Sequence, residues 1–146
     1  MFSGIVEEMG IVTSVDHQHD KSVITVQVDT CFDDVIIGDS VAINGVCLTV
    51  VNCAFAQFTF EAMPETLRLT NLGKLNVHDK VNVERSVKAT TRIGGHLVQG
   101  HVDGTAVIES IEQDGCAIKV WFKKPDLYKD CFIPKGFIAI DGMSLT

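Results

Sequence analysis

The sequence predicts an all-β fold, and three observations lead to this class. Apolar and polar residues alternate with a period of two in several stretches, and turn residues separate these stretches at short intervals. The third observation is an internal repeat, which indicates a tandem duplication of one small domain. Alternation with frequent turns is typical of antiparallel sandwiches and barrels, so we expect a duplicated small β-barrel.

The expected strands follow one another along the chain with little helical periodicity between them. They are "VITVQV" (23–28), "SVAINGVCLTVV" (40–51), "QFTFEAM" (57–63), "KVNVERSV" (80–87), "GTAVIESI" (104–111), "AIKVWFK" (117–123) and "GFIAIDG" (136–142). One short helix is expected at "PETLRLTNLG" (64–73), because Pro64 suits the first turn and Gly73 suits the end. A further short helical turn is expected within "KKPDLYKDC" (123–131).

The repeat consists of three collinear matches about 95 residues apart. "GIVEEMGIVTSV" (4–15) aligns with "GHVDGTAVIESI" (100–111), "VITVQV" with "AIKVWF", and "GDSVAINGVCLT" with "KGFIAIDGMSLT". Only the first copy continues through "KVNVERSV". We therefore expect a first β-barrel domain over 1–92 and the first half of a second over 93–146. Because half a barrel leaves open strand edges, we expect the sequence to be truncated.

Charge and cysteine usage exclude several classes of function. The net charge of -7 argues against nucleic acid or an anionic membrane as a partner, because both need neutralising Lys and Arg. No apolar run reaches the length of a membrane span, and "MFSGIVEEMG" lacks the features of a secretory signal. Five cysteines without a Cys-x-x-Cys pair indicate neither a disulfide framework nor a zinc site. Reduced cysteines predict a cytoplasmic location.

Two hairpin corners carry similar chemistry. Asn-Gly in "INGVCLTVV" (43–51) and Asp-Gly in "IDGMSLT" (140–146) both suit type I′ turns, although Asp141 could also accept a proton. Strand alternation then places small polar side chains on one face of each copy: Cys47 with Thr49, and Ser144 with Thr146. Two interpretations stay open for these pairs. They line a barrel interior that needs small residues, or they face a ligand and supply hydroxyls and a nucleophile.

Two further segments combine backbone freedom with polar side chains. "GGHLVQGHVDG" (94–104) holds four glycines, which permit close approach to a ligand or tight bends, and His101, which is either an acid–base group or a structural histidine. "EAMPETL" (61–67) places Glu65 where a strand passes into the short helix, and the exposed N–H groups there suit polar ligand atoms. His17 and His19 lie in a polar loop and are expected to be solvated.

Taken together, the motifs resemble the riboflavin synthase family in order and spacing over the whole chain. The motifs are "MFSGIVEEMG", "NGVCLTV", "ETLRLTNLG", "VNVERS", "GGHLVQGHVDG" and "PKGFIAIDGMSLT". The resemblance implies two six-stranded antiparallel Greek-key barrels, the second incomplete here, and a C-terminal helix that supports a homotrimer. It also implies that two molecules of 6,7-dimethyl-8-ribityllumazine exchange a four-carbon unit, giving riboflavin and 5-amino-6-ribitylamino-pyrimidinedione, without a cofactor or metal ion.

The resemblance further implies two substrate half-sites, with the first barrel of one subunit facing the second barrel of a neighbour. The first half-site would use Gly4, Ile5, Val6, Val46, Cys47, Leu48, Glu61, Ala62, Met63, Pro64, Glu65 and Thr66, with Phe2 closing over the bound ring. The second would use Gly100, His101, Val102, Lys135, Ser144, Leu145 and Thr146. The family's candidates for base and nucleophile match His101, Ser144, Cys47, Asp141, Thr49 and Thr146.

Two other functions fit parts of the same pattern. One is a non-catalytic lumazine- or flavin-binding protein, and the other is a β-barrel interaction module. The chain keeps the polar candidates of both half-sites together, which favours catalysis: Cys47, His101, Lys135, Asp141 and Ser144. For these 146 residues alone, we expect poor trimer formation and little activity.

Overall fold

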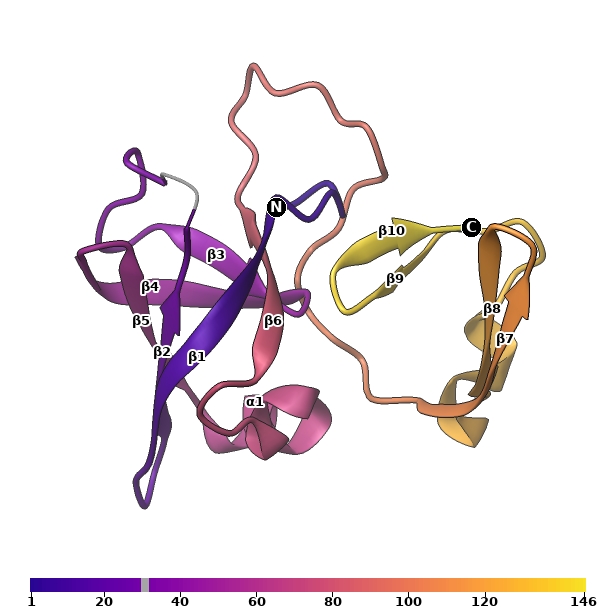
Figure 1. The fold of residues 1–146 in the computed structure, drawn as a ribbon, viewed down its shortest axis with the longest axis horizontal. Helices are drawn as coiled ribbons and strands as arrows, with labels where there is room; N and C mark the ends of the chain where they lie inside the picture. The colour runs from indigo at the N-terminus through magenta and orange to yellow at the C-terminus, as the bar shows by residue number, and fades with distance from the viewer. Residues whose placement is uncertain (30–31) are drawn as a thin grey trace.

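The computed structural model describes residues 1–29 and 32–146, and strands dominate it (Figure 1). The first part of the chain contains β1 (Glu8–His17), β2 (Ser22–Gln27), β3 (Ser40–Ile43), β4 (Val46–Ala54), β5 (Gln57–Ala62), α1 (Pro64–Leu69), the 3₁₀ helix η1 (Asn71–Lys74) and β6 (Lys80–Arg85). The second part contains β7 (Val107–Asp114), β8 (Ala117–Lys123), the 3₁₀ helix η2 (Asp126–Cys131), β9 (Ile138–Ile140) and β10 (Met143–Leu145).

Strands β1 to β6 form one closed antiparallel barrel. Their order around the barrel is β1-β2-β5-β4-β3-β6, and β6 pairs with β1 to close it. Because β2 pairs with β5 while β3 and β4 are inserted between them in the chain, the connection is of the Greek-key kind. The second part forms two separate two-stranded sheets, β7–β8 and β9–β10. The predicted fold class, one complete barrel followed by an incomplete one, is confirmed.

Strand alternation fills the barrel core and decides the orientation of the first hairpin. Val46, Leu48 and Val50 of β4 are at most 5% exposed and pack in the core. Cys47 is half-buried and Thr49 is exposed, so both lie on the outer face. The interpretation that these two side chains line a barrel interior is therefore wrong, because the larger apolar neighbours occupy that space.

The helical expectations hold in part. Pro64 begins α1 as predicted, but the helix ends at Leu69 and η1 follows. Thr70 causes the break, because its Oγ1 donates to the Thr66 carbonyl at 2.7 Å and accepts from the N–H of Leu72 at 3.3 Å. The predicted turn within 123–131 is η2. Within the described ranges, none of the helices has the length and apolar character needed to cross a membrane.

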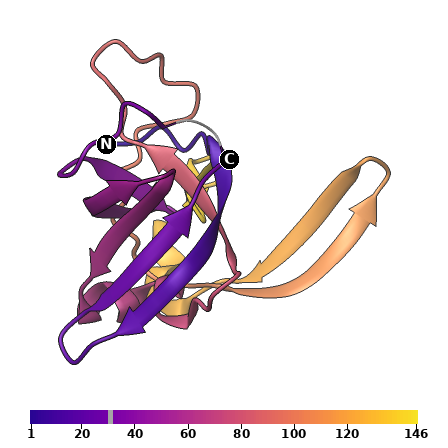
Figure 2. The same cartoon turned by 60° about the vertical axis from the view of Figure 1, so that its left-hand side comes forward.

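The second part of the chain lies against the first through β9–β10 rather than through β7–β8. Figure 2 shows the β7–β8 hairpin projecting away from the barrel, and its residues are largely exposed. The predicted strand 104–111 begins only at Val107. By contrast, β10 contacts the N-terminal segment, and residue 98 pairs with Phe2 as an isolated antiparallel bridge.

The two hairpin corners meet back to back. Asn44 and Gly45 have φ values of 48° and 78°, and Asp141 and Gly142 have 47° and 82°, which confirms the type I′ prediction for both. A Cβ atom on Gly45 would lie 2.7 Å from the backbone nitrogen of Gly142. Glycine is therefore required at these corners by the contact between them as well as by the turn.

Candidate functional site

Backbone hydrogen bonds cross between the two parts of the chain at equivalent positions of the proposed repeat. The N–H of Ser144 donates to the Gly4 carbonyl at 2.7 Å, and the N–H of Cys47 donates to the Gly100 carbonyl at 2.8 Å. In the sequence alignment, Gly4 matches Gly100 and Cys47 matches Ser144. The structure thus brings each predicted glycine to the hairpin of the other half, whereas the sequence analysis grouped it with the hairpin of its own half.

A hydroxyl and an imidazole lie in direct contact at the second hairpin. Ser144 Oγ is 2.7 Å from Nδ1 of His96, and the two residues are 48 positions apart in the chain. The His96 ring also stacks on Phe137, with ring centroids 4.9 Å apart and planes 13° apart. The backbone N–H of His96 donates to the carbonyl of Ser3 at 3.1 Å. The stack and these two bonds fix both the ring and the backbone of His96.

Cys47 occupies the corresponding place at the first hairpin, but its surroundings are apolar. It packs against a small cluster of Phe2, Ala42 and Val98. Over the described ranges, no hydrogen bond joins a side chain to its thiol, and the thiol is free of any disulfide. The two hairpins therefore differ chemically, since Ser144 has an imidazole partner and Cys47 has none.

Phe2 does not occupy the position expected from the resemblance. Its side chain is 0% exposed, and its backbone exchanges hydrogen bonds with Val98 at 2.8 and 3.0 Å. The expectation that the ring closes over a bound ligand requires a correction, because the ring is already enclosed by the contact between the two parts of the chain. Phe2 instead fixes the N-terminal segment on which Ser144 rests.

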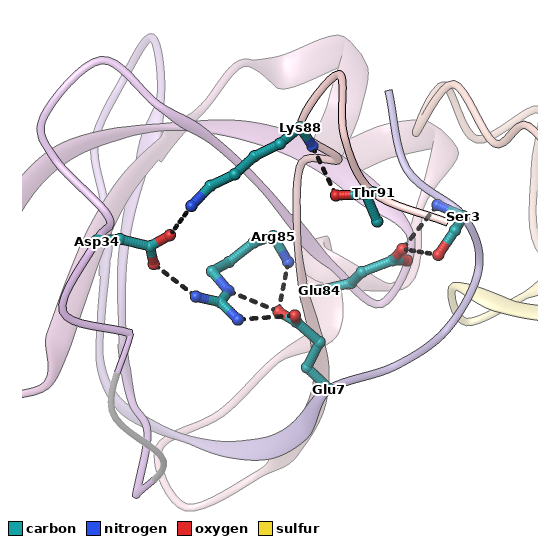
Figure 3. Close-up of polar contacts among 7 residues, drawn as sticks. All are labelled: Ser3, Glu7, Asp34, Glu84, Arg85, Lys88 and Thr91. Carbon is teal, nitrogen blue, oxygen red and sulfur yellow. Dashed lines mark hydrogen bonds and ion pairs between the residues drawn. The ribbon is translucent and has the colours of Figure 1, made fainter. Parts of the chain in front are cut away.

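The N-terminal segment is also bound by a buried carboxylate of the barrel (Figure 3). Glu84 of β6 is 5% exposed, and its Oε1 accepts hydrogen bonds from the N–H of Ser3 at 2.7 Å and from the Ser3 hydroxyl at 2.9 Å. The N–H of Gly4 lies 3.2 Å from both carboxylate oxygens. Residues 2–4, which we call the N-terminal strap, are thus fixed to the barrel.

Beside Glu84, a network of charged side chains joins the strand end to neighbouring loops (Figure 3). Arg85 contacts Glu7 at 2.9 Å and Asp34 at 2.5 Å, and Lys88 contacts Asp34 at 2.6 Å. Hydrogen bonds from Lys88 and then Arg85 lower the pKa of Asp34 to about 2. Glu7 raises the pKa of the Arg85 guanidinium. These ion pairs join the end of β6 to the segments that precede β1 and β3, and they include neither Ser144 nor His96.

The remaining predicted residues of the first half-site come from the N-terminal segment, from β4, from the end of β5 and from the start of α1. Val46 and Leu48 point into the core, so their side chains are not available to a ligand. Glu61 forms an ion pair with Lys21 at 2.6 Å. Glu65 pairs with Arg68 at 2.7 Å, which lowers the pKa of its carboxyl. Ile5, Met63 and Pro64 are exposed, whereas Ala62 is buried.

Asp141 belongs to the contact between the two parts of the chain. Its Oδ1 accepts a hydrogen bond from Asn71 at 3.0 Å, and its carbonyl accepts one from Asn82 at 2.8 Å. Burial raises the pKa of the Asp141 carboxyl, and the hydrogen bond from Asn71 opposes that rise. Both partners come from the first part of the chain, so Asp141 has a structural function whether or not it also accepts a proton.

Other candidates of the second half-site are mostly exposed. His101, Lys135, Leu145 and Thr146 are open to solvent, and Val102 is half-buried against the core of the barrel. Two cavities have volumes of about 190 and 150 Å³. The first is lined by Phe32, Asp33, Val35 and residues 53–58, and the second by Asp34, Val35, Asp39, Ser40 and residues 85–88, so no predicted half-site residue lines either. Among the residues described, no group of three or more His, Cys, Asp or Glu side chains could hold a metal ion.

Sequence reasoning missed two residues that the structure places at the centre of this arrangement. His96 lies in the same glycine-rich motif as His101. Its position directly after Gly95 is the feature of the sequence that could have identified it as a site residue. Glu84 follows Val83 on β6, and both residues are buried, so strand alternation does not hold here. A carboxylate is ordinarily exposed to solvent, and the sequence therefore gives no sign that this one is buried. Neither contact partner is near in sequence, so spacing alone could not identify them.

Comparisons with known proteins agree on the family. A family model described as "Lumazine binding domain" matches residues 3–86 and 99–146. The solved structure of LumP complexed with riboflavin superposes with a TM-score of 0.90 and 26% identity, covering 99% of this chain and 78% of that one. LumP complexed with 6,7-dimethyl-8-(1'-D-ribityl) lumazine gives a TM-score of 0.87 and 25% identity over the same shares. The chain belongs to the lumazine-binding domain family.

Within the lumazine-binding domain family, the relatives that are similar to this chain are riboflavin synthases. Riboflavin synthase of Bacillus subtilis (strain 168) is 42% identical over 146 residues, which cover all of this chain and 68% of the relative. Riboflavin synthase of Schizosaccharomyces pombe is 46% identical over 148 residues, which cover all of this chain and 71% of the relative. Among curated proteins, this chain therefore resembles riboflavin synthases over its whole length.

Proposed function

We propose that this chain is an enzyme with riboflavin synthase activity, a transferase. Two molecules of 6,7-dimethyl-8-ribityllumazine are the substrates. A four-carbon unit passes from one to the other, giving riboflavin and 5-amino-6-ribitylamino-pyrimidinedione. The observation that carries this proposal is the identity of 42–46% to riboflavin synthases over the whole chain.

Two similar half-sites suit a reaction between two copies of one substrate. We propose that the halves arose by duplication and that each contributes a hairpin and a glycine-containing segment. The crossed hydrogen bonds from Ser144 to Gly4 and from Cys47 to Gly100 support this view. Holding two reactants face to face is worth several kcal/mol of the barrier, in favourable cases about 7–11 kcal/mol. Modest side chains are therefore sufficient at such a site.

The Ser144–His96 contact provides a route for the proton that must leave one substrate. In this proposal the Ser144 oxygen accepts a proton from the C7 methyl group as its own hydroxyl proton passes to Nδ1 of His96. The electron pair of the broken C–H bond is delocalised over the lumazine ring, and the imidazole becomes an imidazolium. Proton transfer by a positioned group contributes roughly 10²–10⁴-fold to a rate.

The activity is tested by incubating the purified full-length protein with the lumazine alone. We expect one riboflavin to form for every two lumazines consumed, with no added cofactor. The fluorescence of the flavin measures its formation. Ser144→Ala should lower kcat roughly 100-fold and still bind the lumazine, because the hydroxyl transfers the proton and binding is shared by many contacts. Ser110→Ala, an exposed serine of β7, serves as the matched control.

A second function, binding without turnover, is favoured by the structural neighbours, which are LumP complexes with a lumazine, riboflavin and flavin mononucleotide. If the protein quenches lumazine fluorescence stoichiometrically but forms no riboflavin, this second function replaces the first. Assembly as a homotrimer is part of the enzymatic proposal, and sedimentation velocity measures it directly. A monomer with full activity would contradict the idea that neighbouring subunits complete the site.

A further inference from the structure

Glu84 is an unusual residue to find enclosed at the end of a barrel strand. Its side chain is 5% exposed, and within the described ranges every hydrogen bond that its carboxylate accepts comes from residues 3 and 4. Removing a carboxylate from water is costly unless hydrogen bonds replace the lost hydration. Well-packed apolar residues in such a position are often neutral or stabilising. The stability of the barrel alone therefore does not explain Glu84.

The same peptide group connects Glu84 to His96. The N–H of Gly4 faces the Glu84 carboxylate, and the carbonyl of Ser3 accepts the backbone N–H of His96 at 3.1 Å. This N–H and this carbonyl belong to one peptide bond, which is planar and rigid and points its two polar groups in opposite directions. A displacement of Gly4 at the carboxylate therefore moves the group that holds His96.

The next carbonyl along the strap holds the partner of His96. The Gly4 carbonyl accepts the N–H of Ser144 at 2.7 Å. Space at this point is tight, because a Cβ on Gly95 would lie 2.7 Å from Cβ of Ser144. Two consecutive carbonyls of the strap thus set the backbone positions of both members of the pair whose side chains meet at 2.7 Å.

We propose that Glu84 is a positioning residue for the Ser144–His96 pair. Its carboxylate fixes the N-terminal strap, and the strap fixes the distance between the Ser144 hydroxyl and the His96 ring. The second half lacks an equivalent of Glu84. The Gly100 carbonyl accepts the N–H of Cys47, but over the described residues no carboxylate accepts a hydrogen bond from residue 99 or 100. The catalytic consequence rests on the proposed function, whereas the geometric part does not.

The test combines a substrate-free measurement with kinetics on Glu84→Gln, which keeps the shape and removes the charge. The ring nitrogen chemical shifts of His96, recorded by NMR, should move toward those of Ser144→Ala. The kcat should fall roughly 10- to 100-fold with KM within about twofold, because a small misplacement of reacting groups has effects of this size. Glu109→Gln, an exposed carboxylate of β7, is the matched control and should change neither.

A double-mutant cycle separates positioning from general loss of structure. In a His96→Gln background, Glu84→Gln should lower kcat by less than about twofold, because the pair that it positions is already absent. A full additional loss would overturn the proposal, as would unchanged His96 shifts. Should Glu84→Gln fail to fold, Ser3→Ala removes only the hydroxyl bond at 2.9 Å and is expected to shift the same His96 signals. If the unaltered protein binds lumazine but makes no riboflavin, the proposed function fails, and the NMR result still decides the positioning.

Discussion

Gly100→Ala tests the idea that the two halves are joined by close backbone contact. Gly100 has a φ of 82°, and a Cβ there would lie 2.6 Å from Cβ of Cys47 and 2.8 Å from Cε2 of Phe2. Neither neighbour can move freely, because Phe2 is fully enclosed and the N–H of Cys47 is bound to the Gly100 carbonyl at 2.8 Å. An added methyl group must therefore separate the segments or strain them.

The expected cost has two parts. A positive φ at a non-glycine residue costs about 1–3 kcal/mol, and forcing an extra methyl group into a filled space costs about 1–3 kcal/mol. Gly38→Ala is the matched control, since Gly38 has a φ of 97° but a Cβ there would meet nothing within 4 Å. The control should show only the first cost. Gly100→Ala should therefore lower the free energy of unfolding by about 1–3 kcal/mol more than Gly38→Ala does.

Two measurements test whether close contact requires glycine at position 100. Denaturant titration compares the free energies of unfolding of the two variants. Hydrogen exchange then reports on the Cys47 amide, which should exchange roughly 10- to 100-fold faster in Gly100→Ala and close to the original rate in Gly38→Ala. Equal losses of stability in the two variants, with an unchanged Cys47 amide, would refute the argument that close contact requires glycine at this position.

Two further predictions follow from titrating groups. The lowered pKa of Asp34 means that its bonds to Lys88 and Arg85 contribute stability above its ordinary pKa of 3.8, and this contribution is lost as the pH falls toward about 2. Asp34→Asn should flatten the stability-versus-pH curve in that window, measured by denaturant titration. The raised pKa of Asp141 has the opposite sign, so its charged form opposes folding. Asp141→Asn should keep the bond from Asn71 and give an equal or higher melting temperature at pH 7, a difference that shrinks in acid. A lower melting temperature at pH 7 would contradict this.

The barrel could be predicted because its strands keep a strict alternation. Ile24 and Val26 of β2 are fully buried and alternate with partly exposed residues, so the pattern is visible in the sequence. The sequence of β1 shows the repeat but no strict alternation, and the structure supplies the reason. A register shift between Val12 and Ser14 interrupts its pairing with β2 and breaks the period of two.

The candidate site could be predicted only in part, because its contacts join distant segments. The motifs predict Ser144 and His101 as site residues. The structure shows that His101 is exposed and that His96, from the same glycine-rich segment, is the histidine that contacts Ser144. The domain boundary after residue 92 and the roles of the half-site residues stay predictions. So do the cytoplasmic location and the absence of a cofactor.

The sequence by itself determined the class of fold and the family. Local periodicity and turn residues act over a few neighbouring positions, and the motifs are contiguous, so both can be recognised without a structure. The tertiary structure alone decided which face of β4 is solvent-exposed and that Phe2 is buried. It also decided that hydrogen bonds connect Glu84 through the N-terminal strap to the Ser144–His96 pair. These relations depend on closing a barrel across more than 80 residues of chain, as between Ser3 and Glu84. A local pattern carries no information about which distant segments meet.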